Sequence, residues 1–238
     1  MESLTFVKPQ AEFLARLRRV PPFSAFRPED LPELLAGARQ AAAPPGSMLP
    51  MGDEPGRVLH VILEGTVCLM RSLPHRGHRC LIEICDAPCL VGEAALFDDQ
   101  AAAVEAEVLR QVLFVELQAS AVRRCLKNSP TAQLRMLGYM SARLKRLVSQ
   151  ITTLKLMTGP QRLAQFLTAL ADHTGRSDGV DLPFEKRTLA ALLGMTPESL
   201  SRAFRRLQPL GVGSGHGGTV TIADVERLRQ FIEAETPH

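Results

Sequence analysis

TLAALLGMTPESLSRAFRRL, residues 188–207, has the pattern of two short helices joined by a tight turn. Gly194 is expected to end the first helix, because glycine reaches the left-handed backbone conformation without a Cβ clash. Thr196 is a good N-cap for the second helix, Pro197 suits its first position, and Glu198 lies in its first turn. The stretch therefore predicts a helix-turn-helix.

The second of these helices has one apolar face and one basic face. Leu200, Leu207 and either Phe204 or Ala203 recur at helical spacing, and we expect them to be buried. The opposite face carries Glu198, Ser201, Arg202, Arg205 and Arg206. A glycine turn followed by an arginine-rich helix is typical of proteins that bind in the major groove of DNA. The alternative is a surface helix that is basic by chance, which the turn residues disfavour.

The composition is that of an ordinary globular protein. The 238 residues are 45% hydrophobic and 22% charged, and this length suits two domains. The net charge of +3 is too small to indicate nucleic acid by itself. Without a long apolar run or a signal-peptide pattern, the sequence predicts a cytoplasmic protein with no membrane partner. Its odd number of cysteines, five, favours thiols or ligands over a disulfide framework.

The hydrophobic pattern changes twice along the chain. Residues 9–40 have an amphipathic helical pattern that prolines interrupt. Residues 43–117 contain short apolar runs separated by turns, including runs at 58–63 and 67–70, which suggest a β-sandwich or barrel. After residue 158 the sequence predicts a helix over 162–173, a turn over 175–179, and then the helix-turn-helix. A glycine-rich hairpin around residues 211–218 and a last helix over 224–233 complete this part.

One long helical pattern begins near residue 120 and ends at Gly159-Pro160. Its apolar residues repeat every seven positions in two columns, Leu137, Leu144 and Ile151 and then Met140, Leu147 and Leu154. The narrow stripe favours a coiled-coil seam with a second copy of the chain over a helix packed on its own domain. Between Ala119 and Met157 there are basic residues but no acidic ones. This region therefore makes the local electrostatic potential more positive, which would favour a bound polyanion.

Four segments in this order resemble the CRP/FNR family of bacterial transcription factors. They are MLPMGD (48–53), VILEGTV (61–67), VGEAALF (91–97) and the second helix at 196–207. The resemblance covers nearly the whole chain and implies an α+β protein. Its parts are a double-stranded β-helix (cupin-like jelly roll) sensor domain at 1–118, a dimerisation helix at 119–158 and a winged helix-turn-helix at 159–238. It also implies a homodimer that binds double-stranded DNA and RNA polymerase. The alternative, an enzyme that uses the cupin-like barrel, would need a metal-binding His-x-His with a Glu at strand spacing or a nucleophile–base pair; the sequence shows neither, so we do not expect an enzyme.

The resemblance assigns roles along the second helix. Glu198, Ser201 and Arg202 match the Glu-x-x-Ser-Arg spacing of the FNR branch, which implies a TTGAT-like half-site in an inverted repeat. The chemistry agrees, because arginine bonds guanine O6 and N7 while glutamate accepts from cytosine N4. We expect the remaining polar residues of the helix to contact or border the DNA backbone, namely Thr196, Ser199, Arg205 and Arg206. For Arg205 or Arg206 taken alone, a solvated side chain without a DNA contact stays an alternative.

The sensor domain departs from the cyclic-nucleotide pattern. Gly92 and Glu93 are present, but by spacing Gln100 and Ala101 occupy the positions of the arginine and serine that bind the phosphate. A buried phosphate without a guanidinium is poorly compensated, so the sequence disfavours cyclic AMP and cyclic GMP. No cysteine precedes Cys68, which disfavours the N-terminal iron–sulfur cluster of the FNR branch.

The remaining candidates for sensing are His60, His75, His78, Cys80, Cys85, Cys89 and Cys125. They can be core thiols and solvated histidines, ligands of a haem that senses NO or CO, or redox-active thiols. Cys125 is the first thiol to test, because Arg123, Arg124 and Lys127 nearby favour a thiolate. The spacing matches no standard zinc or iron–sulfur motif, and Cys80 and Cys85 would face opposite sides of a strand. A regulator without any effector, controlled by its abundance, stays an alternative.

Overall fold

The computed structural model describes residues 4–8, 11–50, 57–72, 79–98, 104–175, 179–214 and 218–234. The chain divides into two compact units, Met1–Leu144 and Lys145–His238, and each is described separately. Among the helices of these residues, none combines the length and apolarity needed to cross a membrane.

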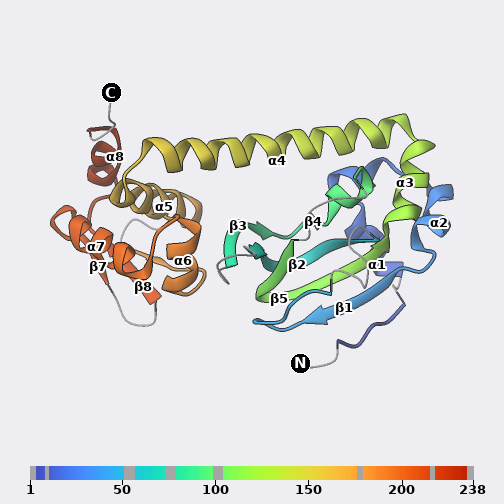
Figure 1. The fold of residues 1–238 in the computed structure, drawn as a ribbon, viewed down its shortest axis with the longest axis horizontal. Helices are drawn as coiled ribbons and strands as arrows, with labels where there is room; N and C mark the ends of the chain where they lie inside the picture. The colour runs from blue at the N-terminus through green and yellow to red at the C-terminus, as the bar shows by residue number, and fades with distance from the viewer. Residues whose placement is uncertain are drawn as a thin grey trace. The chain divides into compact units, whose positions relative to one another are not determined.

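The first unit is an antiparallel sheet preceded by short helices (Figure 1). The helices are α1 (Ala11–Leu17) and α2 (Leu31–Leu35), with the 3₁₀ turns η1 (Pro21–Ala25) and η2 (Pro28–Asp30) between them. The strands are β1 (Arg39–Ala43), β2 (Val58–Ser72), β3 (Arg79–Asp86), β4 (Cys89–Val91) and β5 (Glu105–Gln118). They pair in the order β1-β5-β2-β3, with β4 also on β2, and η3 (Glu93–Leu96) follows β4. The prediction of a β domain behind helical N-terminal segments is confirmed.

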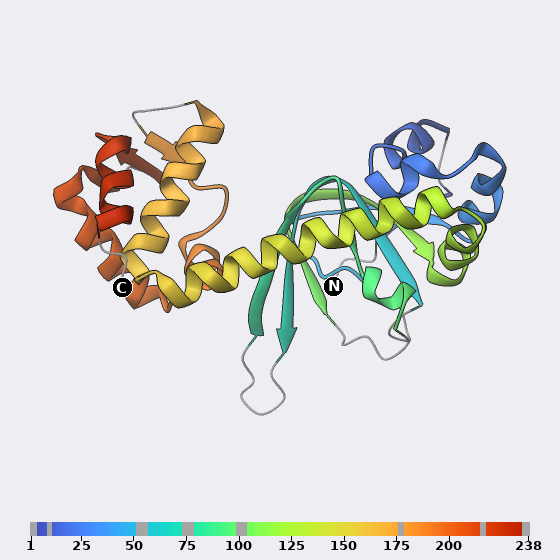
Figure 2. The same cartoon turned by 90° about the horizontal axis from the view of Figure 1, so that it is seen from above.

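Strand β2 differs from the prediction, which had separate apolar runs at 58–63 and 67–70 with a turn between them. The structure has one strand, whose pairing with β5 shifts register around Gly65. Gly65 has a φ of +88°, and a Cβ there would collide with the carbonyl oxygen of Gln111. Glycine is needed at this position because β5 approaches so closely. Gly65 thus lies within a continuous strand. Figure 2 shows that the long strands of this sheet are arched.

The sheet has an apolar core on each face. Leu59 and Val61 of β2 pack on one face with the N-terminal helices and α3 (Ala119–Lys127). Ile62 of β2 and Phe114 of β5 belong to the core on the other face. This alternation follows from the period of two along a strand.

Where the sequence predicted one long helical pattern, the structure has two helices, α3 and α4 (Pro130–Leu156). They separate at Ser129, whose hydroxyl accepts from the N–H of Ala132 at 3.3 Å. Pro130 lacks a backbone N–H and therefore suits the first position of a new helix. Much of α3 is buried in the first unit, so α4 alone provides the long exposed helix.

The second unit is a helical domain with a small sheet. Its elements are α5 (Gly159–Thr174), β6 (Gly179–Asp181), α6 (Lys186–Leu192), α7 (Pro197–Leu207), η4 (Gln208–Leu210), β7 (Val212–Ser214), β8 (Thr219–Ile222) and α8 (Val225–Ala234). The sheet order is β6-β8-β7. The predicted helix-turn-helix and hairpin are confirmed. Strand β6 was missed, because the predicted turn ended at its first residue, Gly179, and the next two residues were assigned to no element. The core of the second unit includes Leu163, Leu189 and Leu207.

Candidate functional site

The turn before α7 has the predicted geometry. Gly194 has a φ of +64°, and a Cβ there would lie 2.7 Å from Cδ2 of Leu154. The Thr196 hydroxyl accepts from the N–H of Ser199 at 3.2 Å and caps α7. The helix buries Leu200, Ala203 and Leu207. These contacts fix the start and the rotation of α7, so its polar face is presented outward.

The polar face of α7 is exposed as the sequence predicted. Its exposed residues are Glu198, Ser201, Arg202, Arg205 and Arg206. Arg202 Nη2 donates to the Ser199 hydroxyl at 3.0 Å, whereas the Ser201 hydroxyl donates to the Pro197 carbonyl oxygen at 3.0 Å. A hydrogen bond from Thr196 lowers the pKa of Glu198, which keeps this carboxylate ionised and able to accept.

A depression of about 340 Å³ beside α7 adds cations that the sequence analysis missed. Lys186 and Arg187, at the start of α6, line it together with Phe204 and Arg205 of α7. Lys186 Nζ lies 5.4 Å from the centre of the Phe204 ring, a cation–π distance. The basic pair directly before residue 188 was the available signal. The two helices thus share a basic, exposed surface.

Arg162, on α5, connects the end of α4 with the turn of the helix-turn-helix. Its Nε donates to the Leu193 carbonyl oxygen at 2.8 Å, and its Nη1 donates to that of Met157 at 2.8 Å. These carbonyls lie at or just beyond the ends of α6 and α4, where intrahelical partners are lacking. The sequence predicted no role for Arg162.

The outer face of α4 carries a stripe of exposed apolar residues. The exposed fractions are 61% for Leu137, 63% for Leu144, 52% for Val148 and 52% for Ile151. We call these four residues the α4 stripe. Of the second predicted column, Met140 is half-buried against the core of the first unit, Leu147 is half-buried, and Leu154 is 46% exposed. The structure places Val148, which the heptad pattern omitted, beside the first column.

The inner face of α4 contributes a cation to a buried ionic cluster. Arg143 Nε lies 2.9 Å from Glu83 Oε2 of β3, and its Nη1 pairs with Glu93 of η3. All three side chains are largely buried. Burial opposes ionisation of the guanidinium, but Glu93 and Glu83 outweigh it and raise the pKa of Arg143. Of the predicted pocket residues, Gly92 and Glu93 begin η3, whereas Gln100 and Ala101 lie outside the described residues.

His60 does not fit the role of a haem ligand. Its side chain is fully buried, its ring lies 5.4 Å from that of Phe114, and its Nε2 is 3.7 Å from Glu116 Oε2. Glu116 in turn accepts from Arg39 Nε at 3.1 Å. A haem would have to separate packed strands to reach this imidazole. His75 and His78 lie outside the described residues.

The thiols also differ from expectation. Cys125 is buried, and burial together with Glu33 and Asp30 raises its pKa to about 11. The predicted thiolate is therefore wrong, because the sequence showed the neighbouring cations but not the burial or the carboxylates across the fold. Cys85 and Cys89 are buried as well, and a contact with Cys85 and burial raise the pKa of Cys89. Cys80 is exposed. Because β3 has an irregularity at Ile82, Cys80 pairs with Arg71 and Cys85 with Val67, four residues apart on β2, so the prediction that the two thiols face opposite sides of the strand is not borne out.

Comparison with known proteins agrees with both units. A cyclic nucleotide-binding domain matches residues 41–129, and a Crp-like helix-turn-helix domain matches residues 161–231. The chain is 26% identical over 216 residues to a CRP-like cAMP-activated global transcriptional regulator of Mycobacterium tuberculosis, covering 89% of this chain and 96% of the relative.

Solved structures support the same fold. FixK2 from Bradyrhizobium japonicum has a TM-score of 0.66 at 18% identity and covers 81% of this chain and 96% of its own. CooA from Carboxydothermus hydrogenoformans has a TM-score of 0.65 at 17% identity, with 85% and 89% covered. The fold and the exposed basic helix define a DNA-binding transcription regulator with a sensor domain. The chain belongs to the CRP/FNR family.

Proposed function

We propose that this regulator is a homodimer that binds an inverted repeat of TTGAT-like half-sites and responds to a signal other than a cyclic nucleotide. The observation that carries the proposal is the capped helix α7 with Glu198 and Arg202 exposed on one face. Arg202 is suited to a guanine and Glu198 to the amino group of a cytosine. Arg205, Lys186 and Arg187 are suited to phosphates, which position the helix without specifying sequence.

The α4 stripe supports the homodimer. Four large apolar side chains, Leu137, Leu144, Val148 and Ile151, are more than half exposed on one helix. Such an exposed apolar stripe is typical of an interface. A two-fold dimer would present two copies of α7 to two half-sites about one helical turn apart, which matches an inverted repeat.

The ionic cluster supports a signal without a phosphate. Arg143 faces Glu93, and it is already paired with two buried carboxylates. An anionic ligand entering beside this cluster would meet two negative charges for one positive charge, which is unfavourable in a buried site. For redox control, Cys80 is the exposed thiol among the described cysteines. The buried His60 gives haem no support.

The competing function is a response to cyclic AMP. The match to a cyclic nucleotide-binding domain favours it, and the M. tuberculosis relative is described as cAMP-activated. Fluorescence anisotropy with a labelled TTGAT inverted repeat separates the two. We expect millimolar cyclic AMP to leave the affinity unchanged, and an increase of tenfold or more would replace our proposal with the competing one.

The same assay tests the dimer. Leu144→Lys with Ile151→Lys should give a monomer by sedimentation and weaken binding to the inverted repeat by about 100-fold or more, because the second half-site no longer adds avidity. Ala142→Lys with Ser149→Lys is the matched control, because both residues are exposed on α4 away from the stripe and have the same spacing as Leu144 and Ile151. A Leu144→Lys, Ile151→Lys variant that stays dimeric, or binds the repeat as well as the control does, contradicts the proposal.

A further inference from the structure

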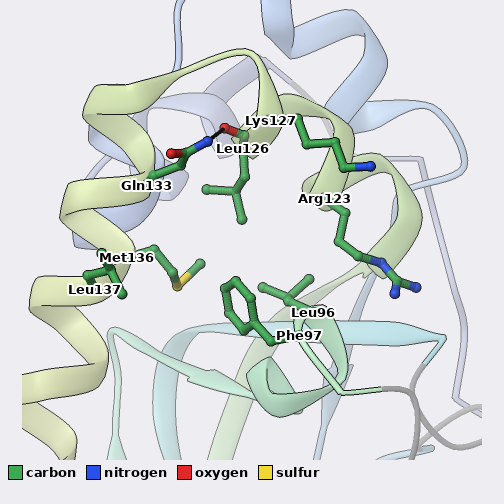
Figure 3. Close-up of a pocket in the computed structure, with 8 residues that line it drawn as sticks. All are labelled: Leu96, Phe97, Arg123, Leu126, Lys127, Gln133, Met136 and Leu137. Carbon is green, nitrogen blue, oxygen red and sulfur yellow. Dashed lines mark hydrogen bonds between the residues drawn. The ribbon is translucent and has the colours of Figure 1, made fainter.

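A second depression of about 340 Å³ lies in the first unit, between η3, α3 and α4 (Figure 3). Leu96 of η3, Leu126 of α3 and Met136 of α4 form its apolar floor, and all three are buried. Phe97 borders it and is 57% exposed. Its size lies at the lower end of the roughly 300–1,000 Å³ of small-molecule pockets.

The charge of this pocket is concentrated at one side. Figure 3 shows the ammonium of Lys127 and the guanidinium of Arg123, both from α3, on the side opposite Met136 and Gln133 of α4. The Gln133 amide already donates to the Leu126 carbonyl oxygen at 2.8 Å. None of the described residues that line the pocket is acidic. The lining therefore changes from apolar to basic across one small cavity.

From this polarity we infer that the pocket binds an amphipathic organic anion, a medium-chain alkyl carboxylate. Its chain packs against Leu126 and Met136, where it loses contact with water. Its carboxylate lies at Lys127, which donates a charge-assisted hydrogen bond to it, and Arg123, which already has a partner within the fold, adds a second positive charge on the same side. A neutral or cationic alkyl compound of equal length lacks this second interaction.

The position of the pocket would let a bound ligand affect the proposed dimerisation helix. The ligand touches η3, which begins at Glu93, and also α4, where Leu137 of the stripe lines the pocket edge. Binding would therefore connect η3 of the sensor domain with α4, the proposed dimerisation helix. This role as an effector rests on the proposed function, whereas the binding itself does not. The competing occupant is a second copy of the chain, because Leu137 belongs to the α4 stripe.

The test uses the full chain without DNA and 8-anilinonaphthalene-1-sulfonate as a fluorescent probe. We expect decanoate, below its micelle concentration, to displace the probe. Decanol and decylammonium should be at least about tenfold weaker, the factor that about 1.4 kcal/mol of lost charge-assisted bonding produces. Equal displacement by decanol, or none by decanoate, overturns the inference.

Substitutions of the basic residues test whether the ligand binds in this pocket. Arg123→Gln with Lys127→Gln should weaken decanoate about tenfold and leave decanol unchanged, and Lys127→Gln alone, at an exposed residue, should do so in part. Arg135→Gln is the matched control, because Arg135 is exposed on α4 outside the pocket. Equal decanoate affinity in all variants contradicts the site.

The oligomeric state decides between the two occupants. Decanoate binding that appears only in the Leu144→Lys, Ile151→Lys variant would show that a second copy covers the pocket and would overturn the inference. A chain that binds decanoate but not the TTGAT repeat would contradict the proposed function alone.

Discussion

Helix α7 and the interior of the β domain use charged side chains in opposite ways. On α7, Glu198 and Arg202 are exposed, and their hydrogen-bond partners belong to the first turn of the same helix. In the β domain, Arg143 is buried and paired with carboxylates from β3 and η3, distant in sequence. One region presents charge to an external partner, and the other neutralises charge within the fold.

The difference predicts which property each arginine controls. Removing a buried cation leaves carboxylates without compensation, so the loss appears in the stability of the fold. Removing an exposed one leaves the fold nearly unchanged, so the loss appears in binding. Matched substitutions in the two regions therefore test whether buried charge controls stability and exposed charge controls binding.

The largest effect is expected in the β domain. Arg143→Met should lower the free energy of unfolding by about 3–5 kcal/mol, because Glu83 and Glu93 stay buried without their cation. Urea denaturation followed by circular dichroism measures it. Arg135→Met, at an exposed position of the same helix, should change stability by no more than about 0.5 kcal/mol.

A second variant identifies the cause of that loss. Adding Glu83→Gln and Glu93→Gln to Arg143→Met should recover part of the stability, because neutral amides cost less to bury than carboxylates. If Arg143→Met is as stable as Arg135→Met, the cluster does not neutralise the interior and the comparison fails.

The next effect is on α7. Arg202→Ala should cost about 1–3 kcal/mol on the TTGAT repeat and relax specificity at one base pair, with unfolding unchanged within about 0.5 kcal/mol. Binding to the repeat and to its single-base variants measures this. Arg205→Ala should instead weaken all sequences equally and reduce the salt dependence. Equal losses on every sequence for Arg202→Ala would contradict its role in base contact.

The same contrast explains what the sequence could reveal. Gly194, Thr196 and Pro197 specify the turn and cap within four residues, so local pattern was sufficient for α7. Arg143 and Glu83 are 60 residues apart, and no local pattern connects them. Gly65 looked like a turn because its close neighbour Gln111 is on another strand.

Cys125 and Met140 show the same limit. Cys125 has basic neighbours in sequence, but Glu33 and Asp30 lie near it only in the folded chain. Met140 fits a heptad, yet it packs on the core of its own unit. Val148 does not fit the heptad columns, yet it is exposed beside them. Periodicity identifies an apolar face but not which partner covers it.

The cap of α7 should give a smaller effect. Thr196→Ala removes the acceptor of the Ser199 N–H and should destabilise the second unit by about 1 kcal/mol. Thr196→Ser keeps the acceptor and is the matched control. Urea denaturation of both variants measures the difference. Equal stability of the two would show that the cap contributes nothing to the exposed helix.

The smallest effect is a pH dependence at Glu116, a buried carboxylate of the β domain outside the Arg143 cluster. Burial pushes the pKa of Glu116 up, but nearby His60 and Arg39 lower it more, so it lies below the ordinary value. Its contribution to stability is therefore complete above the unfolded pKa of about 4.3 and is lost as the pH falls through the lower folded value. The stability gap between the natural chain and Glu116→Gln should be largest at about pH 7 and narrow below about pH 4. Urea denaturation across this range measures the gap, with Glu185→Gln, at an exposed residue of the second unit, as control. A gap that stays constant with pH would show that the interior of the β domain gains no stability from this charge, and the contrast with α7 would then rest on Arg143 alone.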